Sequence, residues 1–181
     1  MEKFNNTYRI PSARADWHKY NGGTYHVTIC TKDRTPYFGT IIEGKMLLSE
    51  IGLFADEQLH HISDHYPYAH IPYWVVMPDH IHAIVAIDRI DLKMMSQSER
   101  WKQSSVNQSM CGISRQRGRL SIIVSGFKRA VSHFANVQGL DFGWQSRYHD
   151  RIIRDVAEMD RTVDYINNNV RKWCDEHGCP L

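Results

Sequence analysis

The sequence contains no apolar run approaching the roughly 18 residues that a membrane-spanning helix needs. Its first residues, Met1 to Asn6, also lack the apolar core of a signal peptide. Both absences exclude the patterns typical of membrane and secreted proteins. We therefore expect a cytoplasmic protein with no membrane-spanning segment.

Cysteine is scarce and scattered. The four cysteines are Cys30, Cys111, Cys174 and Cys179, and no two of them form a Cys-x-x-Cys pair. This spacing argues against a disulfide framework or a zinc knuckle and favours free thiols in a reducing compartment. His177, between the last two cysteines, leaves open a metal site in this tail.

The charges nearly balance, which excludes a protein coated in basic residues for duplex binding. Lys and Arg number 22 against 20 Asp and Glu, a formal net charge of +2. Between residues 91 and 119, however, six basic residues face only two acidic ones. The surrounding segment, about 88–120, is rich in Ser, Gln, Arg and Lys. Such a stretch predicts a basic loop or insertion within one domain spanning 1–181.

Hydrophobic periodicity predicts an α+β domain. The sequence has no internal repeat, and at 181 residues with 42% hydrophobic content it suits one globular core. The expected elements are a strand at 25–31, a loop or hairpin at 38–44, a helix at 50 to about 64 capped by Ser49, a strand–turn–strand at 73–87, a helix capped by Ser121 and ending near Gly139, a strand within 142–154, and a helix from 155. This order fits a ferredoxin-like antiparallel sheet (βαββαβ) with an added C-terminal helix.

His80-Ile81-His82 begins the second strand of the 73–87 pair, just after the turn residues Pro78-Asp79. Residues i and i+2 of a strand point to the same face, so both imidazoles can share one cation. Two ligands do not complete a metal site. Taken alone, the pair is more typical of one core histidine and one exposed histidine than of a metal site.

The last helix carries an apolar stripe, flanked on one side by Tyr165 and Asn169. Because they are four residues apart, these two side chains are neighbours on one surface line. That line can face the histidine pair, or it can belong to an ordinary amphipathic helix with a half-exposed tyrosine. The stripe consists of Met159, Val163, Ile166, Val170 and Trp173.

Four motifs follow one another along the chain: Met-Pro-Asp-His80-Ile-His82, Phe127-Lys128, Trp144-Gln145 and Tyr165-Ile-Asn-Asn-Asn169. Together they resemble the motifs of the HUH single-tyrosine transposases, and most closely those of the REP-associated tyrosine transposases. The resemblance extends from about Arg9 to Trp173.

The resemblance implies Tyr165 as nucleophile and His80, His82 and Asn169 as ligands of Mg²⁺ or Mn²⁺. It implies cleavage and rejoining of single-stranded or hairpin DNA through a 5′-phosphotyrosine, with a homodimer as one possible assembly. Asp79 stands where the family commonly has Asn, and Val170 where it commonly has Pro. Tyr148, in Trp-Gln-Ser-Arg-Tyr-His-Asp, is the second candidate nucleophile, but Ile152 occupies the position four residues later.

Basic and aromatic side chains provide candidate contacts to the DNA backbone and bases. Each of them is also compatible with ordinary solvated surface. The candidates are Arg100, Trp101, Lys102, Arg115, Arg117, Arg119, Lys128, Arg129 and Lys172.

Two other functions remain open. The first is a domesticated, catalytically weak protein that binds DNA hairpins. The second is a metal hydrolase that acts on a small phosphoester, with His61-x3-His65 or the Cys174, His177 and Cys179 tail as further ligands.

Overall fold

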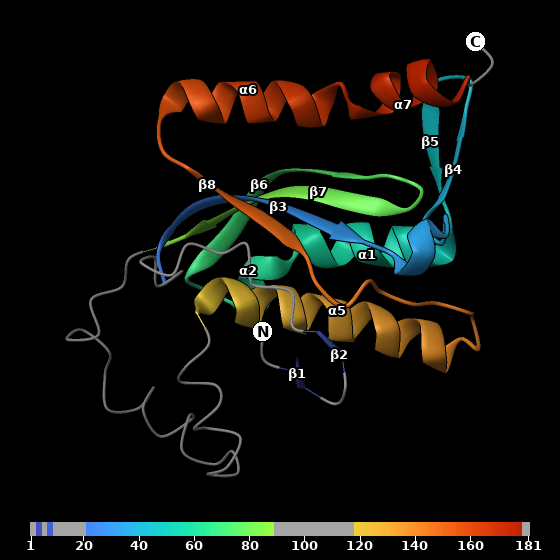
Figure 1. Cartoon of the computed structure of the whole chain (residues 1–181), viewed down its shortest axis with the longest axis horizontal. Helices are drawn as coiled ribbons and strands as arrows, with labels where there is room; N and C mark the ends of the chain where they lie inside the picture. The colour runs from blue at the N-terminus through green and yellow to red at the C-terminus, as the bar shows by residue number, and fades with distance from the viewer. Residues whose placement is uncertain (1–2, 5–6, 9–20, 89–117, 179–181) are drawn as a thin grey trace.

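The computed structural model describes residues 3–4, 7–8, 21–88 and 118–178. A four-stranded antiparallel sheet forms its centre, in the order β6-β7-β3-β8 (Figure 1). In chain order the strands are β3 (Gly23–Cys30), β6 (Ala69–Val76), β7 (His80–Ile87) and β8 (His149–Ile153). The first and third of these strands are therefore central, as the ferredoxin-like arrangement requires.

The helices cover both faces of the sheet. In Figure 1 the helices α1, α2 and α5 lie below the sheet, and α6 and α7 lie above it. Among the described residues, none of the helices has both the length and the apolar character needed to cross a membrane. Their bounds are α1 (Glu50–His60), α2 (Ile62–His65), α5 (Arg119–Val137), α6 (Val156–Asn167) and α7 (Asn169–His177).

Short elements complete the described structure. The expected hairpin after the first central strand is confirmed as β4 (Gly39–Ile42) and β5 (Lys45–Leu48). Its turn residues Glu43 and Gly44 have φ values of 50° and 70°, a left-handed conformation that suits a tight hairpin. A 3-10 turn, η1, covers Lys32–Arg34. The remaining pair is β1 (Lys3–Phe4) with β2 (Thr7–Tyr8).

The α+β order predicted from the sequence is confirmed, whereas the predicted helices differ in detail. The helix expected from 50 to about 64 is divided at His61 into α1 and α2. Ser49 caps α1 as expected, because its side chain accepts a hydrogen bond from the backbone N–H of Gly52. Ser121, by contrast, is not a cap. The helix α5 begins at Arg119, and this earlier start buries Leu120 completely. The side chain of Asn21 accepts a hydrogen bond from the Arg119 backbone N–H at 3.3 Å.

The single last helix that the periodicity predicts is in fact two helices that meet at Asn168. Asp155 caps α6 as expected. At Asn168 the backbone leaves the helical region (φ −94°, ψ 6°), and its side-chain amide donates to the carbonyl of Asp164 at 2.7 Å. Asparagine side chains compete in this way for backbone groups and interrupt helices. Tyr165 and Asn169 therefore lie on either side of a helix break.

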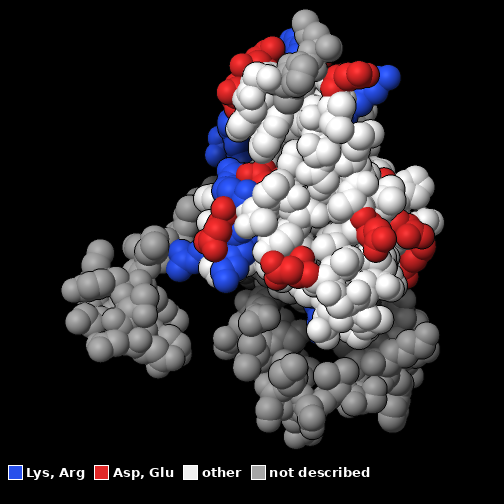
Figure 2. All heavy atoms as spheres, turned by 90° about the vertical axis from the view of Figure 1, so that its right-hand side faces the viewer, with Lys and Arg blue, Asp and Glu red and all other residues white. Residues whose placement is uncertain are grey.

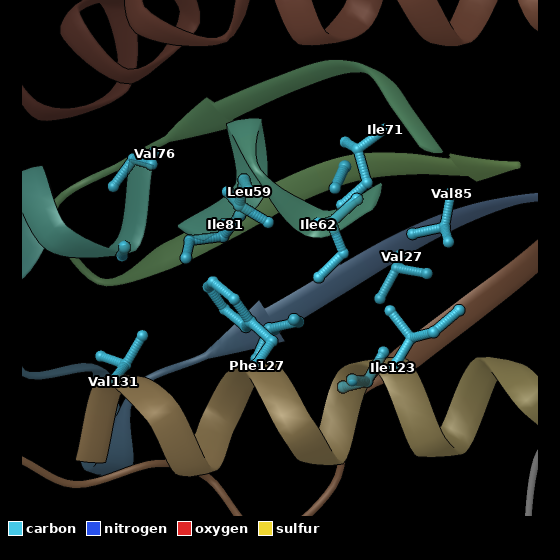
Figure 3. Close-up of a cluster of buried hydrophobic side chains, with 14 of the residues drawn as sticks. Val27, Leu59, Ile62, Ile71, Val76, Ile81, Val85, Ile123, Phe127 and Val131 are labelled. Atoms are coloured by element: carbon cyan, nitrogen blue, oxygen red, sulfur yellow. The ribbon is translucent and has the colours of Figure 1, made fainter. Parts of the chain in front are cut away.

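The hydrophobic core lies between the sheet and the α1, α2 and α5 layer. Figure 3 shows Val27, Ile81 and Val85 of the sheet above α5, which contributes Ile123, Phe127 and Val131 to the same cluster. Alternate residues of β3 and β7 supply this face, because successive strand side chains point in opposite directions. The intervening residues of the same strands, which include both histidines, consequently face α6 and α7.

A bulge in β6 changes which residues of that strand face the core. The pairing with β7 shifts by one residue between His70 and Tyr73, at Ile71-Pro72. An extra residue reverses the alternation of a strand, so Ile71 and Val76 both reach the core. Proline suits this position because it cannot donate a ladder hydrogen bond.

Replacement of Ile81 by Ala should destabilise the fold by about 2–5 kcal/mol, because it leaves a cavity in the core. Ile81 is fully buried, whereas Leu53, which is 59% exposed on α1, provides a matched control. Leu53→Ala should change the free energy of unfolding by less than about 1 kcal/mol. Urea denaturation of both variants tests this difference, and equal losses would contradict the described packing.

Candidate active site

The register between the two central strands brings polar side chains together on the sheet face below α6. Thr28 pairs with His82 and Cys30 pairs with His80, so these four side chains share one face. His26, two residues before Thr28, has the same orientation. Both β7 histidines are buried. The predicted arrangement, with His80 and His82 on one strand face just after a turn, is confirmed.

His82 makes contacts at both ring nitrogens. Its Nδ1 lies 3.0 Å from Thr28 Oγ1 and 3.2 Å from His26 Nε2. Its Nε2 lies 3.2 Å from the hydroxyl oxygen of Tyr165, and the two rings are nearly perpendicular, with centroids 5.0 Å apart. Tyr165 therefore points into the histidine pair from α6.

His80 is oriented through its other ring nitrogen. The Asp79 carboxylate lies 2.5 Å from Nδ1 of His80, and its second oxygen accepts from Arg34 at 3.3 Å. Burial alone would raise the pKa of Asp79, but the hydrogen bond and charge of His80, together with the charge of Arg34, lower it overall. A carboxylate at Nδ1 leaves Nε2 of His80 available for another partner.

His82 and His26 both have pKa values below the ordinary value for histidine. Burial lowers the pKa of His82 to about 3, and the charges of His80, His26 and Arg34 act in the same direction. Burial and the charge of Arg151 also lower the pKa of His26. A neutral imidazole has a free lone pair, which is the form that binds metal ions.

Two side chains of α7, Trp173 and Lys172, contact residues of the site. Asn169 is the first residue of α7 and is buried. Trp173 lies one turn later on the same side of the helix, and its ring centroid is 6.0 Å from that of His80. The ammonium group of Lys172 lies 4.6 Å from the centroid of the Tyr165 ring, a cation–π contact.

The donor set fits a hard divalent cation with open coordination positions. His80 and His82 each have Nδ1 engaged by the protein, and the buried Asn169 can supply an amide oxygen. Within residues 21–88 and 118–178, no three His, Cys, Asp or Glu side chains cluster as metal ligands. A site with three protein ligands in these residues would need a ligand of another type, such as an asparagine.

Tyr148, the second candidate nucleophile, lies on the opposite face of the sheet. Its hydroxyl is 3.3 Å from Ser121 Oγ of α5, and its ring packs against the main core. It immediately precedes β8, in which His149 pairs with Thr28 of the histidine face. Since alternate residues face opposite ways, the tyrosine contacts α5 rather than the histidines.

Hydrogen bonds connect the motifs Phe127-Lys128 and Trp144-Gln145 to each other. The Trp144 indole donates to the carbonyl of Lys128 at 3.0 Å, and the Lys128 ammonium donates to the carbonyl of Gln145 at 2.7 Å. The Gln145 backbone N–H donates in turn to Cys30 at the end of β3. Lys128, predicted as a DNA contact, thus secures the loop that precedes β8.

The other predicted DNA contacts are dispersed. The guanidinium of Arg119 donates to the carbonyls of Asn21 and Asp88 and lies 4.8 Å from the centroid of the Tyr68 ring. It is therefore at the opposite end of β7 from His80. Arg129 lines a cavity of about 580 Å³ between α1, α2 and α5. Outside the described residues lie Arg100, Trp101, Lys102, Arg115 and Arg117.

Charged side chains on the molecular surface occur in small groups. On the face shown in Figure 2, Lys and Arg gather along one edge, with Asp and Glu beside them and in separate groups. Most of that face is uncharged. Any contact with nucleic acid there would depend on a few cations instead of a continuous basic surface.

The first alternative ligand pair, His61 and His65, lies on the other side of the sheet from this site. The Nδ1 atom of His61 lies 3.1 Å from an Asp64 carboxylate oxygen on the exposed surface of α2, and His65 lines the cavity that Arg129 also lines. His177 stacks on Trp173 with ring centroids 4.1 Å apart. Cys179 lies outside the described residues.

Three residues of the site were not found by sequence reasoning: His26, Thr28 and Arg34. His26 and Thr28 alternate on the first strand, but only the β3–β7 register shows that they face His82. Arg34 follows Asp33 in a turn where both residues have positive φ (52° for Asp33 and 57° for Arg34). Residues other than glycine rarely adopt this conformation. No sequence pattern indicates that this turn directs Arg34 toward Asp79.

Comparisons with known proteins support the fold. No protein-family model matches the chain. An uncharacterised protein of Haemophilus influenzae is 29% identical over 157 residues, which cover 83% of this chain and 82% of that protein. The structure of a REP-associated tyrosine transposase bound to a REP hairpin matches with a TM-score of 0.52 and 22% identity, over 89% of this chain and 74% of that one.

A candidate transposase from Deinococcus radiodurans matches at a TM-score of 0.39 and 14% identity, over 88% of this chain and 97% of that one. This likeness is too distant to support an argument. The better match shows that the chain has the fold of a REP-associated tyrosine transposase. The resemblance that the four motifs indicate is thereby confirmed for the fold, and the roles of individual site residues stay predictions.

The free energy of unfolding of the metal-free protein should fall as the pH decreases from 6.5 toward 3. His26 and His82 have lowered pKa values in the fold, so the unfolded chain binds protons that the folded chain excludes. Each excluded proton contributes at most about 1.4 kcal/mol per pH unit. Denaturant titrations in chelator at pH 7 and pH 5 measure the effect.

His82→Gln should reduce this pH dependence, because the variant no longer excludes a proton at that position. His65→Gln, which removes an exposed histidine on α2, serves as the control and should retain it. Equal pH dependence in the wild type and His82→Gln would contradict the prediction.

Proposed function

We propose that this protein is a metal-dependent tyrosine transposase that cleaves and rejoins single-stranded or hairpin DNA. Tyr165 is the nucleophile, and His80, His82 and Asn169 hold the cation. The observation that carries the proposal is the 3.2 Å contact between the Tyr165 hydroxyl and Nε2 of His82. A nucleophile for phosphoryl transfer must lie beside the groups that activate the phosphate, and this contact brings the two together.

In the proposed reaction the Tyr165 oxygen attacks the phosphorus in line with the 3′ oxygen of the preceding nucleotide. The new bond is a 5′-phosphotyrosine, and the broken bond releases a 3′ hydroxyl. The phenol proton leaves to water or a base, and the 3′ oxygen acquires a proton. Because the phosphotyrosine is itself an ester, a second 3′ hydroxyl can reverse the step and join a new strand.

A divalent cation such as Mg²⁺ or Mn²⁺, when bound, would act as a Lewis acid on a phosphate oxygen. The contribution of the protein is to present the ligands. Asp79 contacts Nδ1 of His80, and Thr28 and His26 contact Nδ1 of His82, so that the proposed metal-binding atoms are the two Nε2 atoms. Neutral imidazoles and an amide leave the charge of the cation undiminished for the phosphate.

The proposed partner is DNA with an unpaired strand. The similar tyrosine transposase is bound to a REP hairpin, and a buried histidine pair under α6 requires a phosphate that can approach the sheet. Lys172, above the Tyr165 ring, and the half-exposed Arg34 are placed to contact the backbone near the site. A homodimer that uses two tyrosines would allow two cleavages in one complex.

Tyr165→Phe should abolish formation of a covalent protein–DNA adduct, because the variant lacks the attacking oxygen. The assay is incubation with Mn²⁺ and end-labelled hairpin DNA that has a single-stranded flank, followed by a denaturing gel. Tyr148→Phe is the matched control and should retain the adduct, since Tyr148 contacts α5. The opposite pattern would overturn the assignment.

Retention of the hairpin in a native gel without any adduct in the wild type would instead indicate the alternative, a catalytically weak hairpin-binding protein. The same gel therefore distinguishes the two functions. Loss of both binding and adduct would contradict both.

Removal of a proposed ligand should weaken Mn²⁺ binding by at least about tenfold, since loss of an outer-shell partner alone typically costs 10- to 100-fold. Titration of the DNA-free protein, followed by the electron paramagnetic resonance of free Mn²⁺, measures this in His80→Gln and Asn169→Ala. His65→Gln, on the exposed surface, is the control. Unchanged affinity in both ligand variants would exclude the proposed metal site.

A further inference from the structure

We propose that His26 is a positioning residue for His82, an inference that rests on the proposed function. His26 Nε2 accepts the hydrogen of His82 Nδ1 and thereby keeps the lone pair of His82 Nε2 directed at the Tyr165 hydroxyl. None of the four sequence motifs includes His26. Its role follows from its place on β3, directly beside β7.

The contacts at His82 form a continuous chain across the sheet face. His26 Nε2 is 3.2 Å from His82 Nδ1, and His82 Nε2 is 3.2 Å from the Tyr165 oxygen. The centroid of the His26 ring is 5.2 Å from that of His82 and 5.9 Å from that of Tyr165, and the His26 and Tyr165 rings form a T-shaped pair. His26 therefore contacts both proposed partners and limits rotation of the ring between them.

The proton positions in this chain are constrained by hydrogen-bond chemistry. A neutral imidazole carries one hydrogen, so one ring nitrogen donates and the other accepts. If the Tyr165 hydroxyl donates to Nε2 of His82, the hydrogen of His82 must be on Nδ1 and needs an acceptor. His26 Nε2 is that acceptor when the hydrogen of His26 is on its own Nδ1.

Thr28 alone cannot fix this arrangement. Its hydroxyl lies 3.0 Å from His82 Nδ1 and can either donate or accept, because a hydroxyl rotates to suit its partner. Thr28 is therefore compatible with both tautomers of His82. In the tautomer that we assign, His26 offers only a lone pair and selects the form of His82 whose Nε2 is free of hydrogen.

Two variants test the proposal. His26→Leu removes the acceptor, whereas His26→Gln provides an amide oxygen at similar reach. In metal-free protein, long-range proton–nitrogen NMR spectra report which ring nitrogen of His82 carries the hydrogen. We expect the wild type and His26→Gln to show Nδ1–H, and His26→Leu to show a mixture of both tautomers.

The second readout is the affinity of the same proteins for Mn²⁺ without DNA. It should fall about 10- to 100-fold in His26→Leu, the usual effect of losing an outer-shell partner, and recover in His26→Gln. Circular dichroism and thermal melting verify that each variant is folded. The proposal is overturned if folded His26→Leu has the His82 tautomer and the Mn²⁺ affinity of the wild type.

Neither readout requires DNA cleavage, so the two proposals fail separately. A wild-type protein that forms no adduct contradicts the proposed function while the NMR result still decides the role of His26. Conversely, an active wild type whose His82 carries its hydrogen on Nε2 contradicts the role of His26 alone.

Discussion

The arrangement of the site depends above all on the antiparallel register between β3 and β7. This pairing sets Thr28 opposite His82 and Cys30 opposite His80, and it simultaneously directs Val27, Ile81 and Val85 into the core. A slip by one residue would exchange the two faces, burying imidazoles among isoleucines and exposing the core. The same hydrophobic burial that stabilises the sheet therefore determines which side chains meet below α6.

Two sets of contacts position the side chains of the site: contacts to the histidine rings, and contacts that fix the start of α6. On the sheet side, the Asp79 carboxylate contacts the His80 ring and the Thr28 hydroxyl contacts the His82 ring. On the helical side, Asp155 caps α6, and the Glu158 carboxylate binds the Arg154 backbone N–H and the Arg151 guanidinium. These contacts fasten the start of α6 to the end of β8, so that Tyr165 reaches His82 from a helix anchored to the sheet.

Much of this structure could be predicted from the sequence, because it depends on short-range patterns. Alternation in Tyr25–Thr31, the Pro78-Asp79 turn and the Ser49 cap predicted the strands and first helix, and spacing predicted that His80 and His82 share a face. The helix break at Asn168 was missed, because the apolar stripe continues across it while a local amide bond interrupts the backbone. His26 and Arg34 were missed because their partners are distant in the chain, and only the sheet register and a left-handed turn bring them together.

The contact between Tyr165 and His82 has a thermodynamic consequence under the proposed function. Nε2 of His82 has a single lone pair, so it cannot accept the tyrosine hydrogen and bind a cation at the same time. The two partners therefore compete, and by linkage each weakens the other by the same factor. With a cation held by His82, the Tyr165 hydroxyl would lose this hydrogen bond, and the proposed nucleophile would be free in the metal-bound protein. Without the cation, the hydrogen bond to His82 holds the half-exposed Tyr165 hydroxyl in place.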